Sequence, residues 1–407
     1  VPYKNAVKDL NYINFVQKIN QRRKEEEEMA NKITVALAGL GSRGKDTYAK
    51  AAKIHPDKIE IVAIADVNPK KVEMVAEEYH VPKERCYTSA EEMLKEEKLA
   101  DVMFITTQDR QHVAQAIPAL RKGYHLLLEK PISPDLDECR EIVEVAKECD
   151  RKVVVCHVLR YTPVFRKVKE ILDSGVIGDI VSINASENVG WFHMAHSFVR
   201  GNWRNKELSS PMILQKCCHD MDLYLWLADK KCKSLSSFGS TYLFKEENAP
   251  EGCTKRCLDG CKVKATCPYD AESIYLDSER IGARNGNTRW PLDVVTEIPT
   301  PESVEEALKT GPYGRCVYHC DNDVVDHQVV NLNMTDGSTM SFSMNGHTAD
   351  FARHAQFCGT KGEMNVTMGS WDVEDDFIET TLFGAKLKTE LIPASELSDD
   401  FSGHGGG

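Results

Sequence analysis

The sequence predicts an α/β protein of two domains, in which a doubly wound parallel sheet is followed by an α+β domain with an open, mainly antiparallel sheet. Two observations predict this architecture. Apolar runs alternate with helical stretches up to about residue 156, which is typical of parallel strands covered by helices. From residue 329 onward the strand candidates are short and alternate apolar with polar residues, which is typical of antiparallel strands with one solvated face.

The first strand candidate leads into a glycine-rich turn. The apolar run Ile33–Ala38 is followed directly by Gly39–Gly44, whose sequence reads G-x-G-x-x-G. A second apolar run, Ile59–Ala65, ends on Asp66. Strand, turn, helix, strand and acidic residue in this order are the fingerprint of a Rossmann domain, and they predict a dinucleotide-binding site.

The residues of this turn have separate roles toward a dinucleotide. Gly39 permits the tight turn from strand to helix, Gly41 lets the backbone approach a pyrophosphate, and Gly44 lets the helix pack against the strand. Ser42 and Arg43 open the helix, whose N-terminal N–H groups and partial positive charge attract phosphate. We therefore expect this whole turn to bind the cofactor.

Asp66 predicts which dinucleotide is bound. A carboxylate at this position accepts hydrogen bonds from the hydroxyl groups of the adenosine ribose. A 2′-phosphate on that ribose would lie close to the carboxylate charge, which Arg43 offsets only in part. The sequence therefore predicts NAD(H) rather than NADP(H).

The other elements of the first domain, which we place at residues 29–156, follow in alternation. The further strand candidates are Val102–Thr106, His125–Leu128 and Val153–Cys156. The helical stretches are Lys45–Ile54, Pro69–Tyr79, Gln111–Lys122 and Asp135–Cys149. Ligands of such sheets bind at the carboxyl ends of the strands. The residues expected beside the cofactor are therefore Thr106, Thr107, His112, Glu129 and Lys130.

The second domain, which we place at residues 157–407, has a different pattern. It begins with a helix near Val164–Asp173, a strand at Ile180–Ala185 and a helix at Met212–Leu227. The later strand candidates are Val329–Met334, Thr339–Met344, Ala355–Gly359 and Glu363–Thr367. Between these groups, residues 245–315 are poor in periodicity and rich in Cys, Gly and Pro, so we expect a structured insertion there.

Four cysteines lie close together inside this insertion. They are Cys253, Cys257, Cys261 and Cys267. Four thiolates at such short spacing suit a tetrahedral structural zinc ion, and ligation of an iron–sulfur centre is an alternative. Disulfides or unpaired thiols remain open as the simpler interpretation. A bound metal would explain how a non-periodic segment holds its shape.

Composition excludes two classes of partner. The formal net charge of -12 argues against nucleic acid and against an anionic membrane surface, because both require a basic footprint. The sequence has no apolar run of the roughly 20 residues that span a bilayer. Fourteen cysteines in a chain without a recognisable secretory leader predict a cytoplasmic protein whose thiols are free or metal-bound.

Both ends of the sequence carry unusual segments. The purine-rich codons of Arg22–Glu28, just before Met29, suggest that residues 1–28 are a translated, non-native or disordered leader. A solvated amphipathic helix is the alternative. The chain ends on the glycine-rich stretch Ser402–Gly407, which suggests either truncation or a flexible tail.

Several motifs together resemble the glucose-fructose oxidoreductase, inositol dehydrogenase and rhizopine-catabolism family. They are Gly39–Gly44 with Asp66, Glu129-Lys130-Pro131, Arg160-Tyr161 with Pro163, and His219 with Asp222. The likeness covers nearly all of residues 30–400. It implies a Rossmann domain, a C-terminal open sheet through which homo-oligomers form, and oxidation or reduction of sugars, cyclitols or related polyols with a nicotinamide cofactor.

The resemblance also implies a catalytic set. Lys130 matches the family's catalytic lysine, and His219 and Asp222 match two positions of its Asp-x-Gly-x-His-x-x-Asp helix. Gln215 stands where the family usually has Asp, and Cys217 where it has Gly. An amide cannot take up a proton from the reacting hydroxyl. The roles that the family divides among lysine, aspartate and histidine therefore do not all carry over to this sequence.

These candidates can be weighed on their own chemistry. On one helix, Gln215, His219 and Asp222 would share a face, and His219 could exchange a proton with a substrate hydroxyl. A histidine satisfied within the core is the alternative. Candidate substrate contacts are Arg160, Tyr161, Trp191, His193 and Trp203. Aromatic faces with hydrogen-bonding groups suit a sugar, although a polar loop closing over the sheet would have the same composition.

Together these observations predict an NAD-dependent oxidoreductase that transfers a hydride between nicotinamide and the hydroxyl carbon of a sugar or polyol. One alternative is a redox-neutral NAD-dependent glycosidase or lyase that acts through a transient keto-sugar. A further alternative, from another class, is a non-catalytic NAD-binding sensor.

Overall fold

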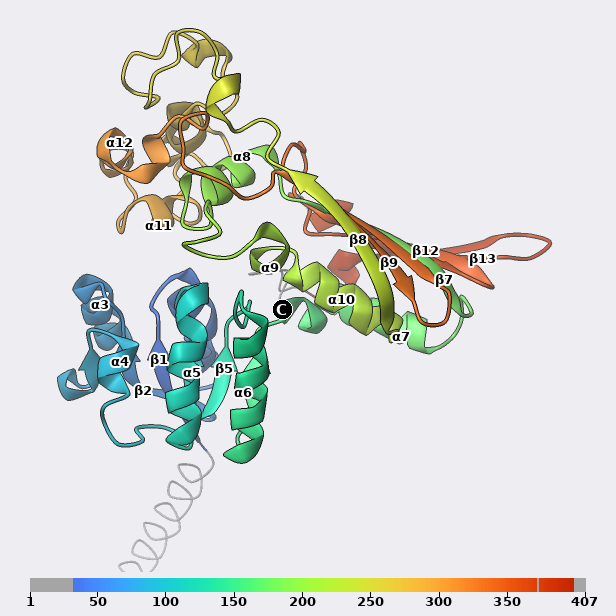
Figure 1. Cartoon of the computed structure of the whole chain (residues 1–407), viewed down its shortest axis with the longest axis horizontal. Helices are drawn as coiled ribbons and strands as arrows, with labels where there is room; N and C mark the ends of the chain where they lie inside the picture. The colour runs from blue at the N-terminus through green and yellow to red at the C-terminus, as the bar shows by residue number, and fades with distance from the viewer. Residues whose placement is uncertain (1–31, 372, 399–407) are drawn as a thin grey trace, which may run out of the picture. The chain divides into compact units, whose positions relative to one another are not determined.

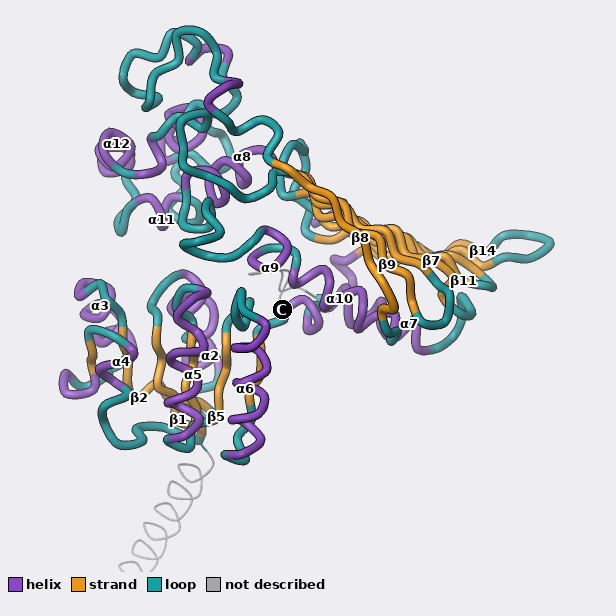
Figure 2. Tube along the Cα trace, viewed as in Figure 1, coloured by secondary structure: helices purple, strands orange, loops and turns teal. Residues whose placement is uncertain are grey.

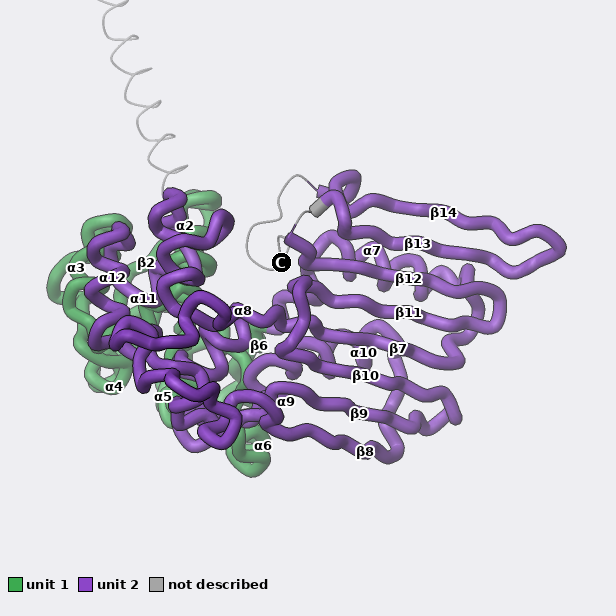
Figure 3. Tube along the Cα trace, turned by 90° about the horizontal axis from the view of Figure 1, so that it is seen from above, with its two compact units in different colours: residues 1–156 green, residues 157–407 purple. Residues whose placement is uncertain are grey.

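The computed structural model describes residues 32–371 and 373–398, and the chain divides after Cys156 into two units (Figure 3). Unit 1 ends at Cys156 and unit 2 begins at His157. The expected leader at residues 1–28 and the terminal residues 402–407 lie outside the described residues. Within the described part of the chain, no helix has both the length and the apolar character needed to cross a bilayer.

Unit 1 contains the predicted parallel sheet, which has six strands, one more than the five that the sequence predicts. Its strands are β1 (Ile33–Ala38), β2 (Ile59–Ala65), β3 (Cys86–Tyr87), β4 (Val102–Ile105), β5 (His125–Leu128) and β6 (Val153–Val155). They lie in the order β3-β2-β1-β4-β5-β6, which is the order of a dinucleotide-binding Rossmann sheet. The strand order reverses between β1 and β4, and ligands of such sheets bind beside this point, at the carboxyl ends of the strands.

Helices cover both faces of this sheet (Figure 1). On one face the apolar core includes residues of α4 (Ala90–Met93), α5 (His112–Arg121) and α6 (Leu136–Glu148). On the other face it includes residues of α2 (Lys50–Ile54) and α3 (Pro69–Tyr79). Unit 1 is therefore doubly wound, as predicted.

One helix of unit 1 differs from the prediction. The stretch Lys45–Ile54 belongs to two segments, η1 (Ser42–Tyr48) and α2. Between them the N–H of Ala49 bonds to Gly44 O at 2.9 Å, one residue further back than in an α-helix. This wider turn begins directly at the glycine-rich sequence.

Unit 2 contains an eight-stranded sheet in which all pairs are antiparallel except β7 with β10 (Figure 2). Its strands are β7 (Ile180–Asn188), β8 (Cys232–Ser240), β9 (His327–Met334), β10 (Thr339–Asn345), β11 (Arg353–Gly359), β12 (Gly362–Met368), β13 (Phe377–Leu382) and β14 (Lys388–Pro393). They lie in the order β14-β13-β12-β11-β7-β10-β9-β8 (Figure 3). The predicted open, mainly antiparallel sheet is therefore present.

One face of this sheet is covered by α7 (Pro163–Asp173) and α10 (Cys218–Ala228) (Figures 1 and 3). The central strands alternate strictly between this face and the outer one. On β10, for example, Phe342 is fully buried while Ser341 and Ser343 on either side are exposed. The outer face of the central strands consequently carries mainly uncharged polar side chains.

The helix predicted at Met212–Leu227 is broken, which corrects the sequence analysis. α9 (Met212–Gln215) ends before Lys216, and α10 begins only at Cys218. The break is held by a buried ion pair, because Lys216 Nζ lies 2.8 Å from Glu187 Oε1 on β7. Gln215 therefore does not share one continuous helix face with His219 and Asp222.

Two further buried charges complete this ion-pair group. Arg353 on β11 donates from Nε to Asp220 Oδ1 at 2.8 Å, and its Nη2 lies 2.9 Å from Glu187 Oε2. The group thus contains two cations and two carboxylates, all of them buried. It links the start of α10 to β7 and β11, so it fixes the helix that carries His219 and Asp222.

The Cys-rich insertion lies between β8 and β9 and has an apolar core. Its α-helices are α11 (Leu292–Val295) and α12 (Pro301–Thr310). Tyr275, Leu292 and Leu308 are fully buried in the same cluster. Residues 245–315 are therefore a folded body of short elements, which explains their weak periodicity.

Asp326 joins the two ends of the insertion. Its fully buried carboxylate accepts hydrogen bonds from Tyr242 N at 2.8 Å and Leu243 N at 2.9 Å, on the outgoing segment. His327 Nδ1 lies 2.9 Å from its Oδ1, and His347 Nε2 lies 3.4 Å from its Oδ2. Burial raises the pKa of Asp326, but the hydrogen bonds from these histidines and backbone groups outweigh it and lower the pKa to about 2.

The low pKa of Asp326 predicts a loss of stability in acid. A carboxyl whose pKa is lower in the folded chain contributes stability that is present above its unfolded pKa of about 3.9 and is lost as the pH falls toward 2. We expect Asp326→Asn to lower the free energy of unfolding at pH 7 by roughly 2 kcal/mol. Chemical denaturation followed by circular dichroism should show this difference shrinking below pH 4.

The control for this prediction is Asp57→Asn, which removes an exposed carboxylate. It should leave the unfolding free energy within about 0.5 kcal/mol of the parent. A pH-independent difference between Asp326→Asn and the parent would contradict the assigned pKa.

Candidate functional site

The glycine turn of unit 1 is packed tightly against the neighbouring strand. Gly39 has a φ of +92°, and a Cβ built there would lie 2.5 Å from Thr106 O. A Cβ on Gly44 would lie 2.0 Å from Gly39 O. Both positions therefore admit only glycine, for the reasons that the sequence motif predicts.

Gly41 has a different environment. Its φ of −74° and ψ of −175° are extended values that any residue can adopt. A Cβ built there would meet no atom of the described residues within 4 Å. The fold itself does not require glycine at this position, so the free space beside the backbone is available to a ligand. This fits the close approach of a pyrophosphate.

Asp66 connects the end of β2 to the glycine turn. Its Oδ2 accepts a hydrogen bond from Leu40 N at 2.6 Å, and its Oδ1 accepts one from Asn68 N at 2.8 Å. The carboxylate is thereby fixed beside the turn, where the ribose of a dinucleotide lies in a Rossmann domain. Ser42 is exposed at the start of η1, next to this position in the chain.

The ends of β4 and β5 complete the same edge of the sheet. Thr106 Oγ1 donates to Ala38 O at 2.9 Å and Gly39 O at 2.7 Å, so it braces the turn. The ring nitrogens of His112 lie 2.7 Å from Pro131 O and 3.1 Å from Thr107 O. These contacts suggest that Thr106 and His112 hold the loops in place.

Glu129 links Lys130 to the glycine helix. This buried carboxylate accepts hydrogen bonds from Tyr48 OH at 2.6 Å and from Lys130 N at 2.8 Å. Arg43 Nε lies 3.8 Å from the same carboxylate. Burial and the Glu129 charge raise the pKa of Tyr48 far above its ordinary value, so the phenol remains a donor. Sequence reasoning missed Tyr48, because no local motif marks it.

A group of polar side chains surrounds His219 within unit 2. His219 is buried on α10, and its ring meets that of His157 edge-on with centroids 5.9 Å apart. Asp222, one turn further along, accepts hydrogen bonds from Arg160 Nε at 2.6 Å and Arg160 Nη2 at 2.5 Å. His157 Nδ1 lies 3.8 Å from the same carboxylate. The structure thus joins His219, Asp222 and Arg160, and adds His157, which the sequence did not mark.

Two other candidates differ in their surroundings. Tyr161 is 58% exposed, so its ring is accessible in unit 2. Gln215 is buried and donates from Nε2 to Trp203 O at 2.9 Å, while its Oε1 accepts from Ser209 Oγ at 3.0 Å. These bonds fix the loop before α9, which favours a structural role for the Gln215 amide.

The aromatic candidates lie in apolar packing. Trp191 packs edgewise on Tyr269, with ring centroids 6.1 Å apart. His193 packs against Trp290 at 4.9 Å and Phe351 at 5.2 Å between centroids. Burial, and then the charge of a nearby lysine, lower the pKa of His193 well below its usual range. Both rings therefore contribute to packing where they lie, and His193 is neutral at pH 7.

The four predicted metal-binding cysteines line one cavity of unit 2. Its wall includes Cys253, Cys257, Cys261 and Cys267, and also Cys316. Cys316 comes from a distant part of the sequence. Apart from the high number of cysteines, fourteen in all, the sequence has no signal that would predict its position beside the other four. His319 also approaches, since its Nε2 lies 3.4 Å from Cys253 Sγ.

Comparisons with known proteins agree with both parts of the fold. A sequence model described as "Oxidoreductase family, NAD-binding Rossmann fold" matches residues 33–157. A second, described as "GFO/IDH/MocA C-terminal domain", matches residues 165–257. The chain is similar to the putative oxidoreductase YteT of Bacillus subtilis, with 24% identity over 389 residues that cover 92% of this chain and 86% of that protein.

A second relative and a solved structure match a smaller part of the chain. Inositol 2-dehydrogenase of Corynebacterium glutamicum is 24% identical over 223 residues, which cover 51% of this chain and 57% of that protein. The WlbA dehydrogenase of Chromobacterium violaceum, solved with NADH and UDP-GlcNAcA, has a TM-score of 0.57 at 17% identity, over 83% of this chain and 74% of its own. At this identity the match shows the shared fold.

The contrast between Gly41 and Gly44 predicts opposite effects of substitution. We expect Gly41→Val to leave the melting temperature within about 2 °C of the parent, since its side chain meets no described atom. It should weaken NADH binding at least about tenfold, because the side chain would occupy the space of the pyrophosphate. Calorimetric titration measures the affinity.

Gly44→Val is the matched control for this experiment. Its side chain would collide with Gly39 O, so the melting temperature should fall by more than about 4 °C. Unchanged NADH affinity in stably folded Gly41→Val would contradict the assignment of the turn to a dinucleotide.

Proposed function

This chain belongs to the GFO/IDH/MocA oxidoreductase family, and we propose that it is an NAD-dependent dehydrogenase acting on a hydroxyl carbon of a sugar or polyol. The observation that carries the proposal is the glycine turn of unit 1. Two of its glycines are required by the protein's own packing, whereas a Cβ at Gly41 would meet no atom of the described residues, which leaves room for a ligand beside the backbone. When bound there, a nicotinamide dinucleotide supplies the acceptor or donor of a hydride.

Two kinds of support favour a hydroxylated substrate. The relatives named above include an inositol dehydrogenase, and the WlbA structure contains a nucleotide sugar. Within unit 2, the group around His219 combines imidazole, guanidinium and carboxylate groups, which can donate and accept hydrogen bonds from hydroxyls. Such a group suits a polyhydroxylated molecule better than an apolar one.

Lys130 is proposed to hold the substrate hydroxyl. It follows β5 directly, at the edge of the sheet where the cofactor turn lies. Its backbone N–H is fixed by Glu129, which also receives the Tyr48 hydroxyl. Because Tyr48 lies on η1, the Glu129 carboxylate connects the helical segment after the glycine turn to the backbone of Lys130.

His219 is proposed to exchange a proton with the substrate hydroxyl, while Asp222 holds Arg160 in place beside it. The Asp222 carboxylate already accepts two hydrogen bonds from Arg160, so it is held as a charged partner of the guanidinium. Gln215 has no role in proton transfer in this scheme, since an amide cannot take up a proton. The division of labour accordingly rests on Lys130 and His219.

The outer face of the unit 2 sheet is proposed as the surface through which copies of the chain associate. Its central strands present side chains such as Asn184, Ser341 and Gln356, which are polar but uncharged. Such a face can be buried by hydrogen bonding without the cost of desolvating charges.

The fixed carboxylate of Asp66 predicts the choice of cofactor. We expect NADH to bind at least about tenfold more tightly than NADPH, because a 2′-phosphate would lie against this negative charge. Asp66→Asn retains a hydrogen-bond acceptor but removes the negative charge, so it should reduce the ratio between the NADH and NADPH affinities. Calorimetric titration of both nucleotides against both proteins measures it. Equal or tighter binding of NADPH by the parent protein would refute the assignment.

The dehydrogenase proposal is tested by the fate of the hydride. With a panel of sugars and polyols and excess NAD, NADH absorbance should rise in proportion to the oxidised product. Lys130→Ala and His219→Ala should each lower the rate at least about a hundredfold. The exposed-residue controls Lys147→Ala and His55→Ala should leave it unchanged.

Two outcomes would overturn this function. Cleavage of a glycoside with no net NADH formation would establish a redox-neutral enzyme. NADH binding without turnover of any member of the panel would favour a sensor.

A further inference from the structure

Three side chains that can ligate a metal ion meet in unit 2, between β8 and β9. They are Cys253, Cys316 and His319, of which Cys316 is buried and the other two are half-buried. One donor atom of each lies within 4.8 Å of the other two, and in the described part of the chain this is the one such set of three or more His, Cys, Asp or Glu residues. The proposed dehydrogenase chemistry makes no use of these side chains.

The spacing of the donor atoms suits a single zinc ion. Zinc lies about 2.3 Å from a thiolate sulfur and about 2.0 Å from a histidine nitrogen, so a sulfur and a nitrogen that share a tetrahedral ion lie about 3.5 Å apart. Cys253 Sγ and His319 Nε2 are 3.4 Å apart. Cys253 and Cys316 border a cavity of about 10 Å³, roughly one water-sized sphere. This volume admits one ion and excludes a cluster of several atoms.

Backbone hydrogen bonds bring the three residues together. Cys316 N donates to Lys255 O at 2.9 Å, which pairs its segment with the loop that carries Cys253. His319 N donates to Cys316 O at 3.0 Å and so closes a tight turn between these two residues. The ligand atoms are therefore positioned by the fold itself, which lowers the cost of ordering them around an ion.

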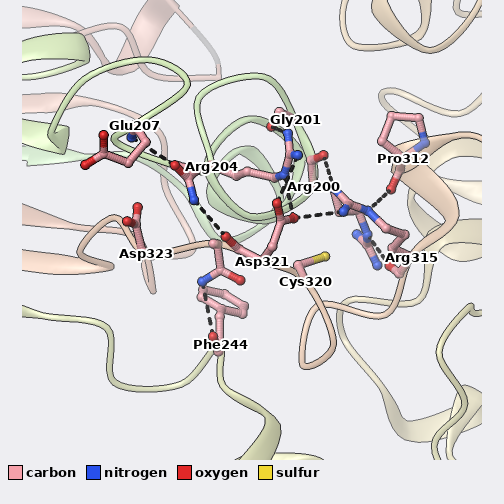
Figure 4. A network of polar contacts seen from close by, with 12 residues as sticks. Arg200, Gly201, Arg204, Glu207, Phe244, Pro312, Arg315, Cys320, Asp321 and Asp323 are labelled. Atoms are coloured by element: carbon pink, nitrogen blue, oxygen red, sulfur yellow. Dashed lines mark hydrogen bonds and ion pairs between the residues drawn. The ribbon is translucent and has the colours of Figure 1, made fainter.

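Ion pairs hold the chain on both sides of this turn (Figure 4). Arg315 directly precedes Cys316, and Asp321 follows His319 by two residues. Arg315 Nη1 lies 2.9 Å from Asp321 Oδ1, and Arg204 Nε lies 2.7 Å from the same oxygen (Figure 4). The two ends of the turn are thus joined by charged groups that are separate from the three ligands.

Glu246 orients the imidazole of His319. Its Oε1 lies 3.3 Å from His319 Nδ1, while Nε2 of the same ring faces the Cys253 sulfur. A histidine that binds a metal characteristically donates its other ring N–H to a carboxylate, which fixes the tautomer whose free nitrogen ligates. A hydrogen bond between Cys253 and His319 would explain the 3.4 Å contact alone, but it leaves the Cys316 sulfur at the same point without a role.

We propose that Cys253, Cys316 and His319 bind one structural zinc ion. Sulfur and imidazole ligands suit zinc, whereas magnesium and calcium prefer oxygen. Both thiols would bind as thiolates, and their charges balance that of the divalent ion. Three protein ligands leave the fourth position of the tetrahedron for a water molecule or for a further thiolate from the cavity wall. The thiols available there are Cys257, Cys261 and Cys267.

The proposed ligand set differs from the one predicted by sequence, which consisted of four cysteines of the loop at residues 253–267. Among the described residues, no three of those four sulfurs lie within 4.8 Å of one another. The ion would fasten the loop at Cys253 to the turn at Cys316, two segments that are more than sixty residues apart. Its role is to hold the insertion in shape, so it goes beyond the proposed dehydrogenase activity.

Metal analysis of the full chain tests the proposal. Protein incubated with zinc under reducing conditions and then freed of excess metal should retain about one zinc per chain. Cobalt in place of zinc should give the strong near-ultraviolet absorbance of cobalt–thiolate charge transfer. Failure to retain zinc after this treatment would overturn the proposal, and so would cobalt binding without the thiolate absorbance.

Single substitutions test the ligand set. Cys253→Ser, Cys316→Ser and His319→Ala should each lower the retained zinc at least about fivefold. His319→Cys keeps a ligating side chain and should retain zinc, which separates the loss of a ligand from the loss of the fold. Cys232→Ser on exposed β8 is the control and should retain zinc as the parent does. Retention in His319→Ala, together with loss in Cys257→Ser, would overturn the assignment.

Glu246→Ala tests the orientation of His319 without disturbing the interior, because the Glu246 side chain is 83% exposed. It should weaken zinc binding about tenfold in competition with a chelator. Glu247→Ala, which removes the neighbouring exposed carboxylate, is the matched control and should bind zinc as the parent does. Equal zinc affinity in the two variants would contradict the proposed geometry of His319. NADH affinity depends on unit 1 and should be unchanged in every variant, so the zinc site and the proposed function stand or fail independently.

Discussion

The neutralisation of buried charge is the constraint on which unit 2 depends. Arg353 lies between Asp220 and Glu187, and Lys216 shares the second of these carboxylates. Removing one partner of such a group leaves an uncompensated ion and costs about 3–5 kcal/mol. Since the group spans α10, β7 and β11, it determines where α10 begins. The position of His219, one residue before Asp220, follows from this ionic arrangement rather than from helix propensity.

The strands show how far the fold can be predicted from sequence. β1, β2 and β5 begin and end where their apolar runs do, because a parallel sheet buries both faces of a strand. β8 and β14 could not be predicted, since all residues of β8 and most of β14 are exposed and neither carries an apolar alternation. Both are edge strands, which form by pairing with one neighbour that is distant in sequence.

Among the candidate site residues, those within one local segment could be predicted from sequence, and those brought together by tertiary contacts could not. Asp66 and the glycine turn could be assigned a place in advance because they belong to one local β-α-β segment, and the hydrogen bond from Leu40 N to Asp66 lies within it. Tyr48 and Cys316 could not, because Glu129 and the loop at Lys255 reach them only through tertiary pairing. The break before α10 has the same origin, since it depends on an ion pair with a remote strand.

The place where the insertion joins the sheet has a consequence for the evolution of this architecture. Ser240 and His327, the last residue of β8 and the first of β9, are directly paired across the two strands. The more than eighty residues between them thus start and finish at the width of a β-hairpin. A short turn could close the same gap with every strand register unchanged. The length of the insertion can therefore vary between lineages without a change in strand pairing, whereas residues of this segment that pack into the core of the sheet, such as Tyr269 and Val317, belong to the structure of unit 2 itself.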